Sequence, residues 1–179
     1  MITDFLLDHS ALVPGALGLA ALVCALVGHA VLRVARPGSP VIPALAVVAA
    51  VGVLVLTMPP TGRGASIRGC TVQFAWPGPG SVELLANVAL LMPVVVFATL
   101  ATRRPWAVLG AGSGASAAIE AVQALVPAIG RACDTNDWAM NTLGVVVATG
   151  IAGATLALAD RAAARRGDGT ARTPIGTAR

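Results

Sequence analysis

The chain has 179 residues, of which 56% are hydrophobic and only 11% are charged. This balance is typical of integral membrane proteins and excludes a large soluble domain, since soluble domains carry about twice that share of charged residues. The formal net charge is +4. All the basic residues are arginines, and most stand at the ends of apolar segments, which is how membrane orientation is encoded; binding to nucleic acid is therefore not expected.

Five apolar segments are long enough to cross a bilayer as helices, which takes about 20 residues. In chain order they are Leu12–Leu32, Val41–Met58, Leu84–Thr102, Pro105–Val126 and Trp138–Ala159, the second being the shortest. The first is expected to be a retained span rather than a signal peptide, because Asp4 and Asp8 precede it without any arginine. The sequence therefore predicts an all-α, multi-pass transmembrane helical bundle of about five spans.

The arginines predict the orientation of this bundle. Alternate connections place one set of arginines on one side of the membrane and a smaller set on the other. The larger set is Arg33, Arg36, Arg103, Arg104, Arg161, Arg165, Arg166, Arg172 and Arg179, and the smaller set is Arg63, Arg68 and Arg131. Because arginine is enriched in cytoplasmic connections, the amino terminus is expected outside and the carboxyl terminus in the cytoplasm.

Three regions follow from these spans. Residues 1–80 would hold two spans and an outer loop, and residues 81–160 would form a three-helix membrane domain. Only Arg103 and Arg104 separate the third and fourth spans, which are therefore expected to form a tight hairpin. Residues 161–179 are rich in arginine, alanine, glycine and threonine without apolar periodicity, which predicts a disordered cytoplasmic tail.

Polar side chains gather in the outer half of the last three predicted spans. At 1.5 Å per helical residue, Asn87, Glu120 and Asn141 lie at similar depth on three different helices. Two sets share a helix face: Ser113, Ser116, Glu120 and Gln123 on the fourth span, and Asp134, Asp137 and Asn141 at the start of the fifth. A carboxylate in hydrocarbon costs roughly 2.5–3.5 kcal/mol on insertion scales, so it usually has a partner or a function. We therefore expect a polar pocket that opens toward the outer leaflet.

Small residues and cysteines predict how the pocket is held together. Gly110-x-x-x-Gly114 on the fourth span, and Gly144-x-x-x-Ala148 with Gly150 on the fifth, are expected to let the helices approach closely. Two Arg-x-Cys elements lie on the side predicted to be oxidising, which predicts a disulfide between Cys70 and Cys133. Cys24 lies within the first span and is expected to stay reduced.

Several of these residues also form a recognisable pattern. The motifs are Asn87–Pro93 (NVALLMP), Ile119-Glu120-x-x-Gln123, Arg131, and Asp137 followed by Asn141-Thr142-Leu143-Gly144. Over about residues 80–155 the pattern resembles the VanZ-like family, named after a teicoplanin-resistance accessory protein. The resemblance implies a small multi-pass protein of the cell envelope, with conserved positions at Asn87, Pro93, Glu120, Gln123, Arg131, Asp137, Asn141 and Gly144. The chain lacks the Phe-x-Pro-x-Gly ending and the Asp-Lys-x-x-His element found in many members.

Three functions stay open at this point. The favoured one is a binding protein whose ligand is a membrane lipid or a lipid-linked cell-wall precursor, and which influences susceptibility to glycopeptide antibiotics. The residues assigned to ligand binding are Asn87, Glu120, Gln123, Arg131, Asp137 and Asn141, with Arg131 on the phosphate. The second is a membrane enzyme that uses Glu120 or Asp137 as general acid or base on the same class of molecule.

The third is a structural protein in which the polar groups only fasten the helices, or which binds a partner membrane protein or a second copy of itself. The sequence contains no Gly-rich nucleotide loop, no Ser/His/Asp set and no zinc-type cysteine cluster. The carboxyl groups of Glu83, Glu120, Asp134 and Asp137 could supply oxygen ligands for Mg²⁺ or Ca²⁺, but no spacing among them is diagnostic of such a site. No metal and no cofactor are therefore expected.

Overall fold

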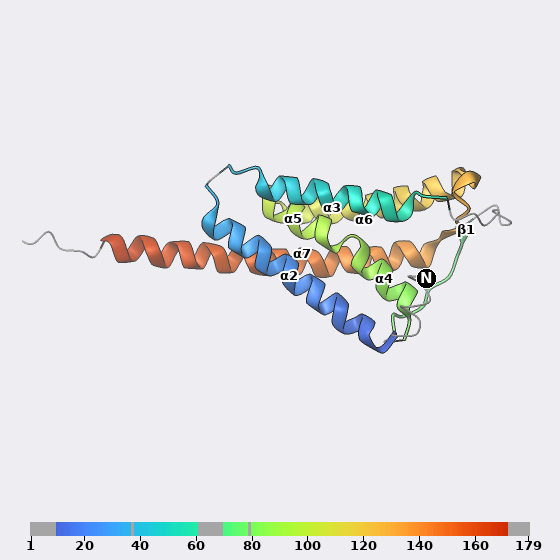
Figure 1. The fold of residues 1–179 in the computed structure, drawn as a ribbon, viewed down its shortest axis with the longest axis horizontal. Coiled ribbons are helices and arrows are strands. Elements are labelled where there is room, and N and C mark those ends of the chain that lie inside the picture. Colours follow the sequence, from blue (N-terminus) through green and yellow to red (C-terminus); the bar gives the residue numbers. More distant parts are fainter. Residues whose placement is uncertain (1–9, 37, 61–69, 79, 172–179) are drawn as a thin grey trace, which may run out of the picture.

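The computed structural model describes residues 10–36, 38–60, 70–78 and 80–171, and its described part is a bundle of helices (Figure 1). The helices are α2 (Val13–Val34), α3 (Val41–Thr57), α4 (Val82–Leu90), α5 (Met92–Thr102), α6 (Pro105–Leu125) and α7 (Thr135–Ala171). The short elements are η1 (Ser10–Leu12), β1 (Cys70–Thr71), η2 (Pro127–Ile129) and β2 (Cys133–Asp134). The prediction of an all-α bundle is confirmed.

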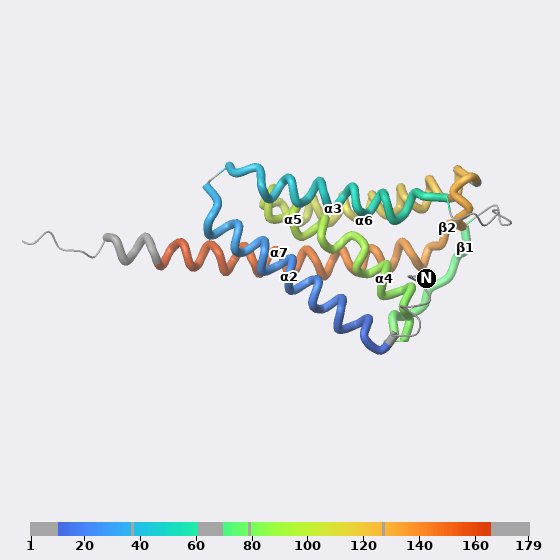
Figure 2. The backbone as a smooth tube through the Cα atoms, in the orientation of Figure 1, coloured from blue at the N-terminus to red at the C-terminus, as the bar shows by residue number. Residues whose placement is uncertain are grey.

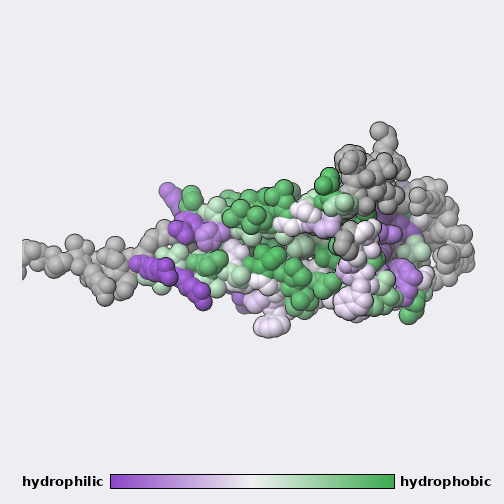
Figure 3. All heavy atoms as spheres, turned by 90° about the horizontal axis from the view of Figure 1, so that it is seen from below, coloured by the Kyte–Doolittle hydropathy of each residue, from purple (hydrophilic) through white to green (hydrophobic). Residues whose placement is uncertain are grey.

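Three segments of the described chain are long and apolar enough to cross a membrane: Val13–Val34, Val82–Thr102 and Thr135–Arg165. The helix α3 is apolar but has only 17 residues. The helix α6 has 21 residues but is not among the three, because serine, glutamate and glutamine on its buried face lower its hydropathy. Figure 3 shows apolar residues along the middle of one face of the bundle and hydrophilic residues toward its ends.

The predicted third span is divided into α4 and α5 at Leu91. Pro93 stands in the first turn of α5. Because proline has no backbone N–H, it cannot donate to the carbonyl of Ala89 and continue the hydrogen-bond pattern of α4. The two helices together still form one apolar segment, Val82–Thr102. The break lets α4 and α5 contact different parts of the neighbouring helices.

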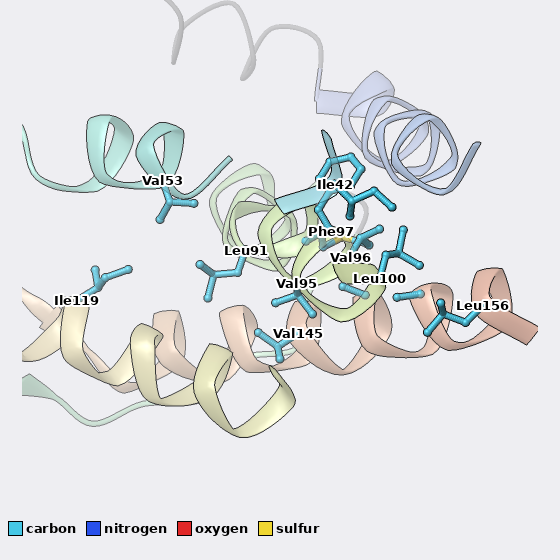
Figure 4. Close-up of a cluster of buried hydrophobic side chains, with 13 residues drawn as sticks. Ile42, Val53, Leu91, Val95, Val96, Phe97, Leu100, Ile119, Val145 and Leu156 are labelled. Atoms are coloured by element: carbon cyan, nitrogen blue, oxygen red, sulfur yellow. The ribbon is translucent and has the colours of Figure 1, made fainter. Parts of the chain in front are cut away.

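The hydrophobic core lies around α5, which packs against α2, α3, α6 and α7. Val95, Val96 and Leu100 of α5 are at most 2% exposed, and Val145 of α7 is fully buried beside them. Figure 4 shows these side chains together with Phe97 in one cluster. The helix α2 crosses α7 at an angle on one side of this core (Figure 2).

On α6, the glycine that makes a close contact with neighbouring helices is not one of the two that the sequence predicted. Gly112 faces valine side chains of α5 and α7, and Gly144 of α7 faces the backbone carbonyl of Val88 on α4. A Cβ added at any of the three other glycines of the predicted motifs would have no described atom within 4 Å apart from its own helix backbone; these glycines are Gly110, Gly114 and Gly150. The prediction of a Gly110-x-x-x-Gly114 contact is therefore wrong for the described chain. The motif correctly indicated that α6 makes a close helix contact, but the glycine that faces the core is Gly112.

The ends of α7 also differ from the prediction. The helix begins at Thr135, three residues before Trp138, because the Asp134 side chain accepts the backbone N–H of Asn136 at 2.8 Å and caps the first turn. At the other end α7 continues to Ala171 and extends past its neighbours (Figure 1), where a disordered tail from Arg161 was expected. Alanine and arginine are strong helix formers, and extending an existing helix needs no new nucleation. Residues 172–179 lie outside the described chain.

The predicted hairpin between the third and fourth spans is present. Arg103 and Arg104 alone join α5 to α6, and Arg103 ends α5 in the left-handed conformation with φ of 56°. Its guanidinium donates to both oxygens of Asp160 on α7, at 2.7 and 2.6 Å. This end of the bundle is therefore tied to α7.

Candidate functional site

The buried face of α6 carries the first part of the site. Ser116, Glu120 and Gln123 are at most 6% exposed, as their helical spacing predicts. One oxygen of Glu120 accepts the backbone N–H of Asp134 at 2.9 Å. The Gln123 amide donates to the carbonyl of Thr57 at 3.2 Å. The end of α6 is therefore connected to the start of α7 and to the end of α3.

The facing side of the site is built by α4 and α7. Because Gly144 has no side chain, α7 lies directly against the backbone of α4 at Val88. One residue earlier on α4, the Asn87 amide donates to a carboxyl oxygen of Asp137. Asn141 stands one turn further along α7 and is 2% exposed, and its carbonyl oxygen Oδ1 is buried without a partner among the described residues.

A short segment after residue 69 is bound to the start of α7. The strands β1 and β2 pair in parallel, with Cys70 opposite Cys133, and a disulfide joins these two residues with their Cα atoms 4.5 Å apart. The backbone of Gln73 exchanges two hydrogen bonds of 3.0 Å with the Thr135 hydroxyl. The Ala75 N–H donates to the Asn136 side chain at 2.9 Å. These contacts hold the segment against the mouth of the site.

These elements surround a cavity of about 670 Å³. All six residues that the sequence assigns to ligand binding lie on its wall: Asn87, Glu120, Gln123, Arg131, Asp137 and Asn141. Arg131 is exposed, and its guanidinium donates to the carbonyl of Leu56 at 3.2 Å. The structure therefore brings together residues from α4, α6, α7 and the connection between α6 and α7.

The cavity carries more acidic than basic groups. Its described wall contains the carboxyl groups of Glu83, Glu120, Asp134 and Asp137, and one guanidinium, that of Arg131. Among the described residues, no group of three or more His, Cys, Asp or Glu side chains is arranged to hold a metal ion. Carboxyl and amide oxygens accept hydrogen bonds, so the wall favours a ligand rich in hydroxyl or amine donors.

A second, apolar recess of about 360 Å³ lies between α3 and α6, which make little direct contact with each other. It is lined by Ala50, Val53, Leu54, Met58, Leu91, Val94, Ala115, Ala118, Ile119 and Val122. Figure 4 shows Val53 and Ile119 turned toward the same space from opposite helices, with Leu91 between them. We call this recess the α3–α6 groove. Ile119 also lines the polar cavity, so the two spaces adjoin.

The contribution of α3 was missed by sequence reasoning. The second span was described only as apolar, yet Thr57 at its end lines the cavity, and its carbonyl accepts the Gln123 amide. Thr57 is 5% exposed. The available signal was one threonine near the end of an otherwise apolar span. Thr71 of β1 also lines the cavity and had no signal of its own.

The long apolar helices define the chain as a helical membrane protein, and a polar cavity lies between them. A family model described as VanZ/LLP1 matches residues 42–157, which is more than half of the chain. The protein belongs to this family. The match includes α3, so it begins well before residue 80, where the motifs placed the resemblance. No curated protein and no solved structure matches the chain.

Proposed function

We propose that this protein binds a membrane lipid or a lipid-linked cell-wall precursor at the end of the bundle predicted to face outward in the cell membrane. One observation carries the proposal: a cavity lined by carboxyl and amide groups adjoins the apolar α3–α6 groove, with Ile119 on both walls. A molecule that fits both spaces has a polar head and at least one hydrocarbon chain. A soluble polar ligand would make no use of the groove.

The chemistry of the wall suggests the kind of head group. The buried Asn141 oxygen has no hydrogen-bond donor among the described residues, and an unpaired buried acceptor costs about 1–3 kcal/mol. A hydroxyl or amine of the ligand would satisfy it. Glu120 and Asp137 are acceptors for the same kind of donor, and Arg131 at the rim would hold a phosphate. A phosphate-linked sugar on a hydrocarbon chain combines these features, as lipid-linked cell-wall precursors do. Holding such a molecule would change its exposure to glycopeptide antibiotics.

The polar end of the ligand is tested by lipid mass spectrometry of the purified protein. The variant Glu120→Gln removes the acidic group but can still accept the Asp134 N–H, so the link between α6 and α7 is kept. The control is Asp160→Asn, the same chemical change outside the cavity. We expect a lipid enriched by the wild type and the control to fall about tenfold in Glu120→Gln, since a hydrogen bond to a charged group contributes about 1.5–3 kcal/mol.

The hydrocarbon end is tested with two neighbouring alanines. Ala118 lines the α3–α6 groove and Ala117 does not. Ala118→Trp should fill the groove and reduce retention of the same lipid, whereas Ala117→Trp should leave retention unchanged. The wild type and all four variants are compared at the same yield of folded protein. Identical lipid profiles would refute ligand binding and would support the structural alternative, in which the polar groups only hold the helices together.

A membrane enzyme acting on the same class of molecule is the second candidate, because Glu120 and Asp137 line one cavity. One could act as general acid or base on a lipid-linked phosphate or glycan. Turnover of the copurifying lipid by the wild type, abolished in Glu120→Gln while the lipid is still retained, would favour catalysis over binding.

A further inference from the structure

The opposite end of the bundle contains another recess, where α2 crosses α7. It has a volume of about 470 Å³ and is lined by His29, Arg33, Leu158, Arg161, Ala162 and Arg165. The two α2 residues are one turn apart, and the α7 residues follow the spacing i, i+3, i+4 and i+7. Each set therefore shares one face of its helix, and the two faces meet. The recess is therefore formed jointly by α2 and α7, and not by the end of a single helix.

The positive charge in this recess has no acidic partner on its wall. Three guanidinium groups line it, and none of the lining residues that the structure describes is acidic. Asp160 precedes Arg161 in sequence, but its carboxyl group is paired with Arg103, at 2.7 and 2.6 Å. Arg33 lies 3.4 Å from the His29 ring nitrogen, which supplies no negative charge. Three like charges in one recess repel each other, so an anion bound among them would be stabilised.

The surroundings of the recess identify the kind of anion. Leu158 on its wall is 57% exposed, and Leu26, one turn before His29 on α2, is 58% exposed. Figure 3 shows hydrophilic residues at the end where α7 leaves the bundle, beside the apolar band. The recess therefore lies where lipid head groups meet hydrocarbon. Arginine binds phosphate with two parallel hydrogen bonds, and basic pockets between membrane helices bind phosphate-rich lipid heads.

We infer that this recess is a binding site for the phosphate groups of an anionic lipid, in the leaflet predicted to be cytoplasmic. A lipid head with two phosphodiester groups matches the site best, because two negative charges can be shared among three guanidinium groups. Its chains would lie against the exposed leucines of α2 and α7. The site is separate from the polar cavity and does not depend on the function proposed for that cavity.

The test is native mass spectrometry of the purified full chain in detergent, titrated with tetraoleoyl cardiolipin or with dioleoyl phosphatidylcholine. The wild type should bind cardiolipin in preference to phosphatidylcholine. Arg161→Gln/Arg165→Gln should weaken cardiolipin binding about tenfold or more. The control Arg36→Gln/Arg104→Gln removes the same charge from the same end of the bundle but outside this recess, and should weaken binding by a smaller factor than Arg161→Gln/Arg165→Gln.

Three results would overturn the inference. Equal loss in the two double variants would mean that only the total positive charge matters. Equal binding of the two lipids by the wild type would mean that phosphate charge is not recognised. Displacement of cardiolipin by an equal concentration of inorganic pyrophosphate would assign the site to a soluble anion. Glu120→Gln should bind cardiolipin as the wild type does, which separates this test from that of the outer cavity.

Discussion

Replacing Gly144 with alanine should force α4 and α7 apart. A Cβ at this position would overlap the Val88 carbonyl oxygen and would lie 2.8 and 3.2 Å from its carbonyl carbon and Cα. These are backbone atoms, so no change of side-chain rotamer relieves the overlap. The two helices must therefore separate, and the Asn87–Asp137 hydrogen bond beside this contact must lengthen.

The expected cost has two parts. Overpacking a close contact costs about 1–3 kcal/mol, because the neighbouring atoms lose their van der Waals contacts as the helices move. Weakening the hydrogen bond between Asn87 and Asp137 adds about 0.5–1.5 kcal/mol. We therefore expect Gly144→Ala to lower the free energy of unfolding by about 2–4 kcal/mol.

The assay is equilibrium unfolding in mixed micelles with increasing sodium dodecyl sulfate, followed by tryptophan fluorescence. Gly150→Ala is the matched control on the same helix, because its added Cβ has no described atom within 4 Å apart from the backbone of α7 itself. It should be neutral or stabilising by up to about 1 kcal/mol, since alanine is the better helix former. Equal stability of Gly144→Ala and Gly150→Ala would refute the close contact between α4 and α7.

Three further predictions concern other contacts. Reduction of the bond between Cys70 and Cys133 should lower the free energy of unfolding by about 2–4 kcal/mol, because it joins residues 63 apart; alkylation without reductant that labels both thiols would contradict this. The pair of Arg103 and Asp160 is more than half exposed, so a double-mutant cycle should give a coupling below about 1 kcal/mol, and a larger value would show stronger burial than the structure has. Gln123→Leu removes the donor to the Thr57 carbonyl at the end of α3 and should lower the free energy of unfolding by about 1–3 kcal/mol; an unchanged free energy of unfolding would contradict a contribution from this bond.

Much of the fold follows from local sequence. The length of each apolar run placed α2, α3, α6 and the combined segment of α4 and α5 to within a few residues, because transfer to hydrocarbon depends on the segment itself. The polar face of α6 was also predictable, since helical periodicity alone puts Ser116, Glu120 and Gln123 on one side. Local sequence did not find the break at Leu91, although Pro93 was a visible signal for it.

The sequence by itself determined that this is a helical membrane protein and which polar residues could share a depth and a face, because both follow from hydropathy and helical geometry within single segments. Only the tertiary structure decided that Gly112 rather than Gly110 meets the core, that Thr57 of α3 joins the cavity, and that an apolar groove adjoins it. These features depend on how residues far apart in the chain pack against one another. Packing of that kind is set by the shapes of both surfaces, which the period of one helix does not contain.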